Sequence, residues 1–477
     1  MDSLKSVQTS PPETIALEAP TIAPLLKEVP DLPVITRSSP SFDELRATFD
    51  QTHAKPPTAI IRPRSETEVQ AVVRYCFQKQ ILVVVITGGN DPGGRSCVKD
   101  TRAVLLDMRS LDTVVVSDGQ KLATVGGGTT CGRLLQVLDQ QGLTTPTAFA
   151  GGVGYTSWAC GGGYGILAGP MGLGVDQIQG ARVVLATGQV VDTADDSGDL
   201  LWALRGGGAA LLGVIVQLRI KIYSRTAGLG GIVTFPLSEA PSIFGKLEEL
   251  YARSGRPASF AGELMIINPP GSGGLLCFVA YWSLEDDKRD IDEAKAFLHS
   301  FAALGTVVAN SVTETTPKLF TLSIPNPQLY GESIAYTVHS CCVDGWSSKL
   351  GRIFTQMPLP TATSSIVIHS SHGVAATVND GASFYNRKSH LLIGLSGGAP
   401  AADEAARSVA ASWAGKLQED ITSQGLAMDS GYINFSMPHT DDALWYFGAE
   451  KALRLRGIKD KLDPTGFWNH GVANFPR

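Results

Sequence analysis

The sequence predicts an α+β protein of two domains, in which an α/β domain near the N-terminus is followed by an α+β domain with an antiparallel sheet. Three observations support this prediction. The chain has 477 residues, too many for one ordinary hydrophobic core. Strand and helix patterns alternate near the N-terminus, as in an α/β unit. Its 52 glycines concentrate between Gly88 and Gly213 and become sparse from about Thr226 onward.

The N-terminal elements follow from local signals. We expect residues 1–40 to form an extended arm, because prolines interrupt any helix there: Pro11, Pro12, Pro20, Pro24, Pro30 and Pro33. Ser65 and Glu68 form a capping box that predicts a helix start, and the apolar run 81–86 predicts a buried strand. The other expected elements are strands over 59–63, 104–107, 113–116, 122–125, 181–187 and 213–223 and a helix over 132–141.

Two further segments complete the predicted organisation. Residues 146–165 are too rich in glycine for a regular helix or strand, so we expect backbone held close to something flat or bulky. After residue 225, strands over 276–281 and 366–369 alternate with helices over 242–252 and 290–301. The basic, helical stretch 451–461 is expected to return to the first domain. The expected bounds are 1–40 for the arm, 41–225 and 226–425 for the domains, and 426–477 for the C-terminal segment.

Composition and charge exclude several classes of partner. The formal net charge is -6, so neither nucleic acid nor an anionic membrane is expected to bind. No apolar run reaches the roughly 18 residues of a membrane span. No signal peptide is recognisable, so we expect a cytoplasmic protein. The seven cysteines are scattered without a C-x-x-C pair, which favours reduced thiols.

Several common catalytic motifs do not occur in the sequence. It contains no G-x-G-x-x-G, G-x-x-x-x-G-K-[ST] or H-E-x-x-H pattern. His369 and His372 are three residues apart on a predicted strand, where side chains at that spacing face opposite sides. We therefore expect no metal site.

The loop 87–96 is the most informative segment of the chain. It follows the predicted strand 81–86 and contains four glycines: Gly88, Gly89, Gly93 and Gly94. Such a loop can turn its N–H groups inward and form a concave nest for an anion. Arg95 and Ser96 could add a charge and a hydroxyl group. The loop therefore predicts a phosphate-bearing cofactor.

The order of these segments resembles the PCMH-type FAD-binding domain of the vanillyl-alcohol oxidase superfamily, and most closely the berberine bridge enzyme-like oxidases. The resemblance covers the first domain and the C-terminal segment, whereas the middle domain matches only loosely. The matching positions are Pro63, 65–69, Gly88, Gly89, Gly93, Ser96, Val153, Gly154, 161–165, Gly172, Leu173, Asp176, Asp199, Leu200, 202–208, Gly213, Val214, Tyr432, Asn434, Tyr446, Gly448, Arg454, Leu455, Ile458, Lys459, Asp463, Pro464 and Phe467.

The resemblance implies FAD as cofactor, in a domain of two α/β subdomains. It implies that the first loop wraps the pyrophosphate, that the second glycine-rich segment lines the ribityl chain and isoalloxazine ring, and that the strand from Gly213 passes near the adenine. The residues expected to bind FAD are Thr87, Gly88, Gly89, Asn90, Asp91, Gly93, Gly94, Ser96, Ala150, Gly151, Gly152, Val153, Gly154, Thr156, Ser157, Gly162, Gly163, Gly165, Gly213, Val214, Asn434, Phe435 and Asn469.

The departures from the family pattern concern covalent attachment and the base. Asn90 stands where family members carry the histidine that bonds to the flavin, and Ala150 stands where bicovalent members carry a cysteine. Neither side chain can form those bonds, so we expect non-covalent FAD. Phe435 stands where many members place a tyrosine base. Thr156 and Ser157 replace a glycine pair, which changes the expected path of the second segment.

The candidates for a replacement base are His372, His369 and Tyr330. His372 lies in a stretch that in the family faces the flavin, and a histidine there could act as a base near neutral pH; a hydrogen-bonded core histidine is the alternative. Tyr336, Tyr385 and Glu263 are further pocket candidates. Val153 aligns with a position where valine tends to admit oxygen.

Three functions are compatible with the sequence. The first is a FAD-dependent oxidase of specialised metabolism that transfers a hydride from a substrate C–H to flavin N5, with O2 as electron acceptor. The second is a redox-neutral isomerase or pericyclase on the same scaffold, because both covalent anchors and the tyrosine are missing. The third is a flavin-binding protein without catalysis. A low charge density hints at an apolar natural-product intermediate as substrate.

Overall fold

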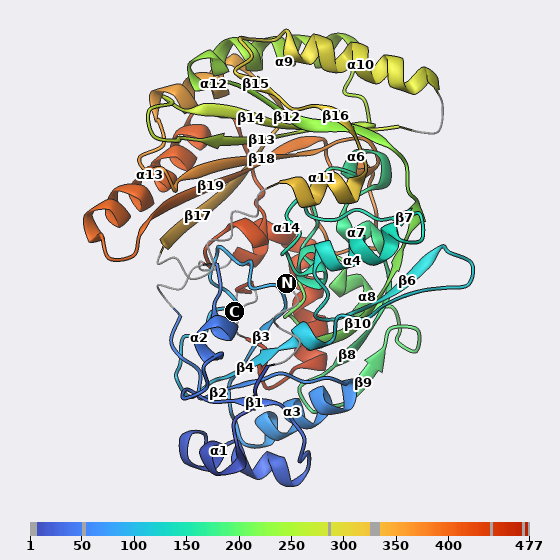
Figure 1. The fold of residues 1–477 in the computed structure, drawn as a ribbon, viewed down its shortest axis with the longest axis vertical. Helices are drawn as coiled ribbons and strands as arrows, with labels where there is room; N and C mark the ends of the chain where they lie inside the picture. Colours follow the sequence, from blue (N-terminus) through green and yellow to red (C-terminus); the bar gives the residue numbers. More distant parts are fainter. Residues whose placement is uncertain are drawn as a thin grey trace.

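The computed structural model describes residues 7–49, 54–284, 288–324, 334–438, 442–469 and 473–475. The fold is a mixture of helices and sheets, and two smaller sheets lie below one large antiparallel sheet in the view of Figure 1. In the described ranges, no helix combines the length and the apolar character that a bilayer crossing requires. No disulfide joins any of the seven cysteines, all of which are buried.

The first sheet is built from the N-terminal strands in the order β1-β2-β4-β3. Its members are β1 (Val34–Ile35), β2 (Ala59–Ile61), β3 (Val83–Ile86) and β4 (Val104–Asp107). β4 pairs in parallel with both β2 and β3, and the helix α3 (Glu66–Gln78) connects β2 to β3. The Ser65 hydroxyl accepts a hydrogen bond from the Glu68 N–H at 3.2 Å, as the capping box predicts.

The second sheet is antiparallel and has the order β5-β6-β10-β8-β9. Its strands are β5 (Val114–Val116), β6 (Leu122–Gly126), β8 (Ile178–Val184), β9 (Val190–Asp192) and β10 (Val214–Lys221). The helices α4 (Cys131–Asp139), α5 (Tyr155–Cys160) and α8 (Asp199–Leu204) supply side chains to the same hydrophobic core as this sheet. The short strands β7 (Leu143–Thr144) and β11 (Tyr223–Ser224) pair beside it.

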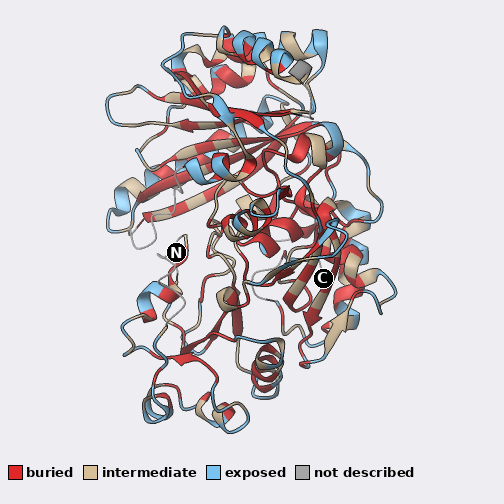
Figure 2. Ribbon diagram, turned by 45° about the vertical axis from the view of Figure 1, so that its right-hand side comes forward, coloured by how far each residue is buried: buried red, intermediate tan, exposed pale blue. Residues whose placement is uncertain are grey.

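The large sheet contains nine strands among the described residues, all in antiparallel pairs. They are β12 (Gly228–Pro236), β13 (Phe260–Ile267), β14 (Leu275–Ser283), β15 (Ala309–Asn310), β16 (Thr313–Thr315), β17 (Ile334–Val343), β18 (Ser365–Ser371), β19 (His390–Pro400) and β20 (Ala427–Met428). The helices α9 (Ala240–Ser254), α10 (Lys288–Ala302), α12 (Ser348–Gln356) and α13 (Glu404–Ser423) pack on its outer face, and the interior is buried (Figures 1 and 2).

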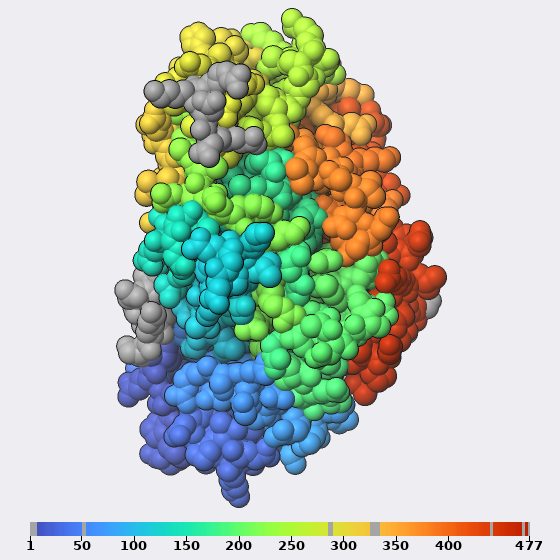
Figure 3. Space-filling model, turned by 90° about the vertical axis from the view of Figure 1, so that its right-hand side faces the viewer, coloured from blue at the N-terminus to red at the C-terminus, as the bar shows by residue number. Residues whose placement is uncertain are grey.

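The C-terminal helix α14 (Asp442–Leu462) packs on the second sheet, whose strands lie more than 200 residues earlier in the sequence. Leu455 and Ile458 join the same core as Leu200 and Leu204 of α8. Figure 3 shows this red segment against the green residues that precede β11. Gly448 interrupts the helix with a φ of 67°.

Two expectations about local structure are wrong. The N-terminal arm contains the helix α1 (Pro12–Glu18) and a 3-10 turn, η2 (Ala23–Lys27). Pro12 and Pro24 stand in the first turn of these elements, where a missing N–H costs nothing and the fixed φ favours helix. Residues 146–165 are also not wholly irregular, because α5 forms within them over six residues that contain no glycine.

Candidate functional site

A cavity of about 660 Å³ lies between the two N-terminal sheets and the large sheet. One side is formed by β3, the loop 87–96 and residues 148–158 and 207–211. The opposite side is the inner face of the large sheet, where β13, β17 and β18 contribute Met265, Ile267, Tyr336, Val367 and His369. The segment 432–435 closes a third side.

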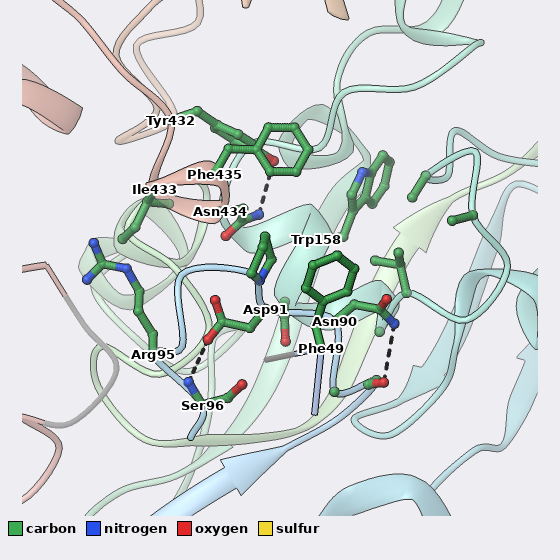
Figure 4. Close-up of a pocket in the computed structure, with 18 of the residues that line it drawn as sticks. Phe49, Asn90, Asp91, Arg95, Ser96, Trp158, Tyr432, Ile433, Asn434 and Phe435 are labelled. Carbon is green, nitrogen blue, oxygen red and sulfur yellow. Dashed lines mark hydrogen bonds between the residues drawn. The ribbon is translucent and has the colours of Figure 1, made fainter. Parts of the chain in front are cut away.

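The loop 87–96 is held in shape by its own aspartate. The Asp91 carboxylate accepts hydrogen bonds from the Gly93 N–H at 3.1 Å and the Ser96 N–H at 2.6 Å, and Figure 4 shows the Ser96 contact. Two of the expected inward N–H groups are therefore already satisfied by the chain. The Ser96 hydroxyl is buried and has no hydrogen-bond partner in the described part of the chain.

Arg95 does not extend into the loop as a free cation. Its guanidinium donates to the Asp442 carboxylate at 2.9 Å and to the Tyr446 hydroxyl at 3.1 Å. The ion pair is buried, with 7% of the Arg95 side chain and none of the Asp442 side chain exposed. It ties the loop to the first turn of α14.

The two glycine-rich segments touch backbone to backbone. A Cβ atom on Gly88 would lie 2.3 Å from the Gly154 nitrogen and 2.7 Å from the Gly152 oxygen. The Asn90 amide donates to the Gly152 carbonyl at 2.8 Å and to the Gly88 carbonyl at 3.2 Å. Asn90 therefore acts as a bridge between the two segments (Figure 4).

The structure brings only part of the expected cofactor set to the cavity. The members that line it are Thr87, Gly88, Gly89, Asn90, Asp91, Ser96, Ala150, Val153, Gly154, Ser157, Asn434 and Phe435. Those outside its lining, all among the described residues, are Gly93, Gly94, Gly151, Gly152, Thr156, Gly162, Gly163, Gly165, Gly213, Val214 and Asn469.

The glycines at 162–165 face other parts of the protein. A Cβ on Gly162 would meet the Phe384 ring at 2.6 Å, one on Gly163 would meet Gly174, and one on Gly165 would meet the Thr147 oxygen at 2.1 Å. The bulky neighbours expected from the sequence are thus side chains and backbone of the chain itself. Similarly, a Cβ on Gly213 would lie 2.4 Å from the Val184 oxygen.

His369 and Glu263 form a buried pair at the sheet side of the cavity. The register Leu264↔Ile368 and Met265↔Val367 makes them cross-strand neighbours. His369 Nδ1 lies 3.0 Å from Glu263 Oε1, with 4% and 3% of the side chains exposed. The N–H direction is not aligned for a hydrogen bond, and neither His369 Nδ1 nor Glu263 Oε2 has another partner in the described ranges.

Aromatic rings surround the His369 imidazole. Phe435 stacks on it with the ring centroids 5.5 Å apart and the planes 16° apart. Phe149 lies at 5.4 Å and Tyr164 at 5.9 Å. These rings fix the plane of the imidazole, so its remaining nitrogen, Nε2, is the one that is directed away from Glu263.

His372, the other histidine candidate, lies on the opposite face of the sheet from the cavity. Its Nε2 donates to the Phe260 carbonyl at 3.0 Å, and its Nδ1 accepts from the Ser370 hydroxyl at 3.2 Å. Burial, reinforced by the charge of Arg256, lowers the pKa of His372 to about 3. Both nitrogens are therefore occupied, and the geometry leaves no acceptor for a substrate proton. Tyr330, the third candidate, lies outside the described residues.

Two of the tyrosines at the cavity, Tyr432 and Tyr164, are held as hydrogen-bonded phenols. Tyr432 accepts from the Gly163 N–H at 3.2 Å and from the Asn434 amide at 3.0 Å, and burial raises the pKa of Tyr432 to about 12. Tyr164 donates to His390 at 2.8 Å, and burial raises its pKa well above the usual value. Unlike these two phenols, the His369 imidazole has a ring nitrogen, Nε2, that is directed away from its protein neighbour Glu263.

The FAD binding domain family matches residues 57–194. The FAD-linked oxidoreductase aurO of Gibberella zeae is 34% identical over 95% of this chain and 87% of its own length. The chain belongs to the FAD-linked oxidoreductase family. The (R)-6-hydroxynicotine oxidase of Paenarthrobacter nicotinovorans is 31% identical, but over only 44% of this chain and 45% of its own length.

Solved structures show the same fold at low sequence identity. The 6-hydroxy-D-nicotine oxidase of Arthrobacter nicotinovorans superposes with a TM-score of 0.81 at 20% identity, covering 94% of this chain and 98% of the other. The berberine bridge enzyme of Eschscholzia californica gives 0.80 at 18% identity, covering 96% and 99%. The expected PCMH-type fold with a large antiparallel sheet is confirmed by these neighbours.

The cavity of this FAD-linked oxidoreductase fits its cofactor on two observations. The Ser96 hydroxyl is an unsatisfied buried donor at the glycine-rich loop, where a phosphate oxygen would accept from it. Trp158, Phe435 and the backbone at Gly154 offer flat or side-chain-free surface to a planar ring. We conclude that the donors and the shape of the cavity are suitable for FAD.

Sequence reasoning missed several lining residues of the oxidoreductase. They are Phe49, Val83, Val84, Val85, Pro92, Ala148, Phe149, Trp158, Tyr164, Ala209, Ala210, Leu211 and Trp468, with others on the large sheet. The glycine run at 206–208 is the signal that could have indicated 207–211. The rest are apolar residues that resemble ordinary core positions in sequence.

Proposed function

We propose that the protein is a FAD-dependent oxidase that holds FAD without a covalent bond and uses His369 as its catalytic base. The cofactor would be held by the lining part of the loop 87–96, by Ser157 and Val153 of the second segment, and by Asn434. Relatives named as oxidases and as a FAD-linked oxidoreductase support this class of reaction.

Asn90 is the observation that supports non-covalent binding. Its side chain is an amide, which is not a nucleophile, and its donor atoms are directed at two backbone carbonyls. Ala150, at the second attachment position, offers only a methyl group. Purified protein should release all of its FAD on acid precipitation. Fluorescent flavin that stays with the chain on a denaturing gel would contradict the proposal.

The single observation that supports the oxidation chemistry is His369 at the cavity wall. When bound, FAD would supply the hydride acceptor for the substrate carbon, with O2 as the final oxidant that is reduced to hydrogen peroxide. His369 Nε2 accepts the proton from the hydroxyl group on that carbon, so the carbon becomes a carbonyl. Phe435 cannot take this role, but it holds the imidazole plane by stacking. Val153 lines the same cavity, in keeping with access of oxygen.

The test is a screen of benzylic and phenolic alcohols for hydrogen peroxide release, followed by the substitution His369→Gln. For an accepted substrate, we expect kcat to fall at least about a hundredfold, the usual loss for a missing general base. His372→Gln, made at the histidine that faces away from the cavity, is the matched control and should keep the activity. Equal activity in H369Q and the wild type would overturn the role of His369.

A redox-neutral isomerase or cyclase can be told from an oxidase by its turnover in the absence of air. Its turnover would continue without air and without bleaching of the flavin absorbance, whereas an oxidase stops once its flavin is reduced. If the protein is an oxidase, its photoreduced flavin should also be reoxidised by air faster than free reduced FAD. The apolar walls of the cavity favour a substrate of specialised metabolism with few charges.

A further inference from the structure

We propose that Glu263 fixes the tautomer of His369, so that the cavity selects an uncharged aromatic substrate that presents a hydroxyl group and rejects ligands that present only acceptors. This inference deepens the proposed function and depends on it for the location of the reacting group. The proposal concerns binding selectivity, which can be measured apart from turnover.

The first step is the position of the proton on the imidazole. A carboxylate is an acceptor only, and Glu263 Oε1 lies 3.0 Å from His369 Nδ1. The N–H is not aligned for a full hydrogen bond, but a carboxylate oxygen 3.0 Å away attracts a proton on Nδ1 and repels a lone pair there. We therefore place the proton of the neutral ring on Nδ1, which leaves Nε2 as the acceptor. An Nε2–H tautomer would set the lone pair of Nδ1, a buried atom with no hydrogen-bond partner in the described part of the chain, against the lone pairs of Glu263 Oε1.

The second step concerns the charges near the pair. Arg256 is a cation that interacts electrostatically with Glu263. Burial lowers the pKa of Arg256, and the nearby Tyr251 and Glu263 partly oppose that shift. Its guanidinium is bonded to the Ser370 hydroxyl, and Ser370 lies on the sheet face away from the cavity with His372. The groups that face His369 itself are the aromatic rings of Phe149, Phe435 and Tyr164. The cation coupled to Glu263 thus lies behind the sheet, while aromatic rings face His369 on the cavity side.

The third step concerns the surface around Nε2. Met265, Ile267 and Val367 line the same sheet face next to His369, and Phe149 and Phe435 flank its ring. Such walls bury an aromatic ring well and leave a charged group without solvation. A hydroxyl group can donate to Nε2, whereas a carboxylate would set its lone pairs against a bare acceptor.

The experiment compares 2-naphthol with 2-naphthoate, two ligands with the same ring system, by isothermal titration calorimetry of FAD-loaded protein at pH 8. We expect 2-naphthol to bind at least about tenfold more tightly than 2-naphthoate. Its hydroxyl makes one hydrogen bond to Nε2, whereas the carboxylate of 2-naphthoate leaves that buried acceptor unpaired. In Glu263→Gln the amide can donate to Nδ1, the proton moves to Nε2, and the preference should fall about tenfold. Equal affinities in the wild type, or no binding of either ligand, would overturn the proposal.

Two further variants separate selectivity from folding. Glu314→Gln makes the same chemical change at an exposed position of β16 and should keep the full preference for 2-naphthol. His369→Gln keeps Glu263 but removes the tautomer-locked acceptor, so the preference should also be lost there. A preference retained in both E263Q and H369Q would show that the pair does not select the ligand. Since heat of binding is measured, a protein that selects 2-naphthol yet oxidises nothing would refute the proposed oxidase function alone.

Discussion

Removal of the Ser96 hydroxyl should weaken FAD binding without changing the stability of the FAD-free protein. Its hydroxyl has no partner among the described residues, although its backbone N–H is bonded to Asp91. We expect Ser96→Ala to leave the unfolding free energy of the FAD-free protein within about 0.5 kcal/mol of wild type. Its FAD affinity should fall about tenfold, because a hydrogen bond to a charged phosphate is lost.

Fluorescence titration with FAD and urea unfolding of the FAD-free protein provide the two measurements. Ser436→Ala is the matched control, since the Ser436 hydroxyl is bonded within the protein to Ser340 at 2.7 Å. That variant should lose stability. If S96A instead destabilises the FAD-free protein and binds FAD normally, the hydroxyl does not serve the cofactor.

Two buried histidines make stability depend on pH. Burial lowers the pKa of His372 to about 3 and that of His390 to about 4, below the 6.5 of an unperturbed histidine. Between pH 6.5 and 4, these two histidines are therefore protonated in the unfolded chain but remain neutral in the folded chain. The stability from keeping these rings neutral is complete above pH 6.5 and is lost as the pH falls, by up to about 1.4 kcal/mol per pH unit for each histidine.

Urea unfolding at pH 7, 6 and 5 checks this expectation. In His372→Gln the amide cannot be protonated, so the free energy of unfolding should fall less steeply with acid than in the wild type. His299→Gln, at an exposed position of α10, should keep the wild-type slope. A wild-type slope in H372Q would mean that His372 contributes nothing to the acid sensitivity.

At the scale of elements, the contact between the two glycine-rich segments is the most sensitive point. A methyl group on Gly88 would overlap the backbone of Gly154, with a separation of 2.3 Å from its nitrogen. We expect Gly88→Ala to destabilise the protein by about 1–3 kcal/mol, as other overpacked sites do, and to release FAD. Thermal unfolding and the ratio of flavin to protein absorbance measure both effects.

Gly457→Ala is the matched control for that substitution. Gly457 lies within α14, and a Cβ there would have no heavy atom within 4 Å. Alanine favours a helix over glycine by up to about 1 kcal/mol, so this variant should be as stable as the wild type or more so. Similar losses in both variants would show that G88A does not act through the contact between the segments.

Local signals predicted most elements well, for physical reasons that are local. The cap at Ser65 gave the start of α3, and the apolar run 81–86 contains β3. The N-terminal arm was mispredicted because a proline that breaks a helix interior is favoured in its first turn, and composition alone does not tell these positions apart. The helix α5 was missed because glycines on both sides of it dominate the segment 146–165.

At the scale of the whole molecule, a buried ion pair joins the flavin-side loop to the C-terminal helix. Arg95 and Asp442 are 347 residues apart in sequence, and their atoms approach to 2.9 Å. Asp442→Ala removes the carboxylate that neutralises the buried guanidinium, so we expect a loss of about 3–5 kcal/mol of unfolding free energy. Guanidinium chloride unfolding measures it.

The exposed pair Arg46–Asp43 provides the contrast, since 83% of the Asp43 side chain is exposed. Asp43→Ala should cost less than about 1 kcal/mol. Equal effects of D442A and D43A would show that the long-range pair does not stabilise the fold.

The candidate site was harder to predict than the fold because its residues come together from distant parts of the chain. The glycines of 87–89 and the flanking Asn90 and Asp91 were found, since a tight turn after a strand is visible in sequence. His369 was one of three candidates for the base, and only the sheet register sets it beside Glu263 while His372 faces away. Gly162, Gly163 and Gly165 looked like cofactor positions because close packing against the chain itself makes the same demand for a missing Cβ.

The hydrogen bonds of Asp91 within its loop affect when FAD is loaded into the protein. Because Asp91 and Asn90 hydrogen-bond to the backbone of the loop and of its neighbouring segment, we expect the loop to hold its shape before FAD binds, so that folding need not wait for the cofactor. The empty form should therefore be a durable species that is filled reversibly. In a cell, the fraction of active molecules would then follow the supply of flavin, and preparations would differ in colour until they are incubated with added FAD.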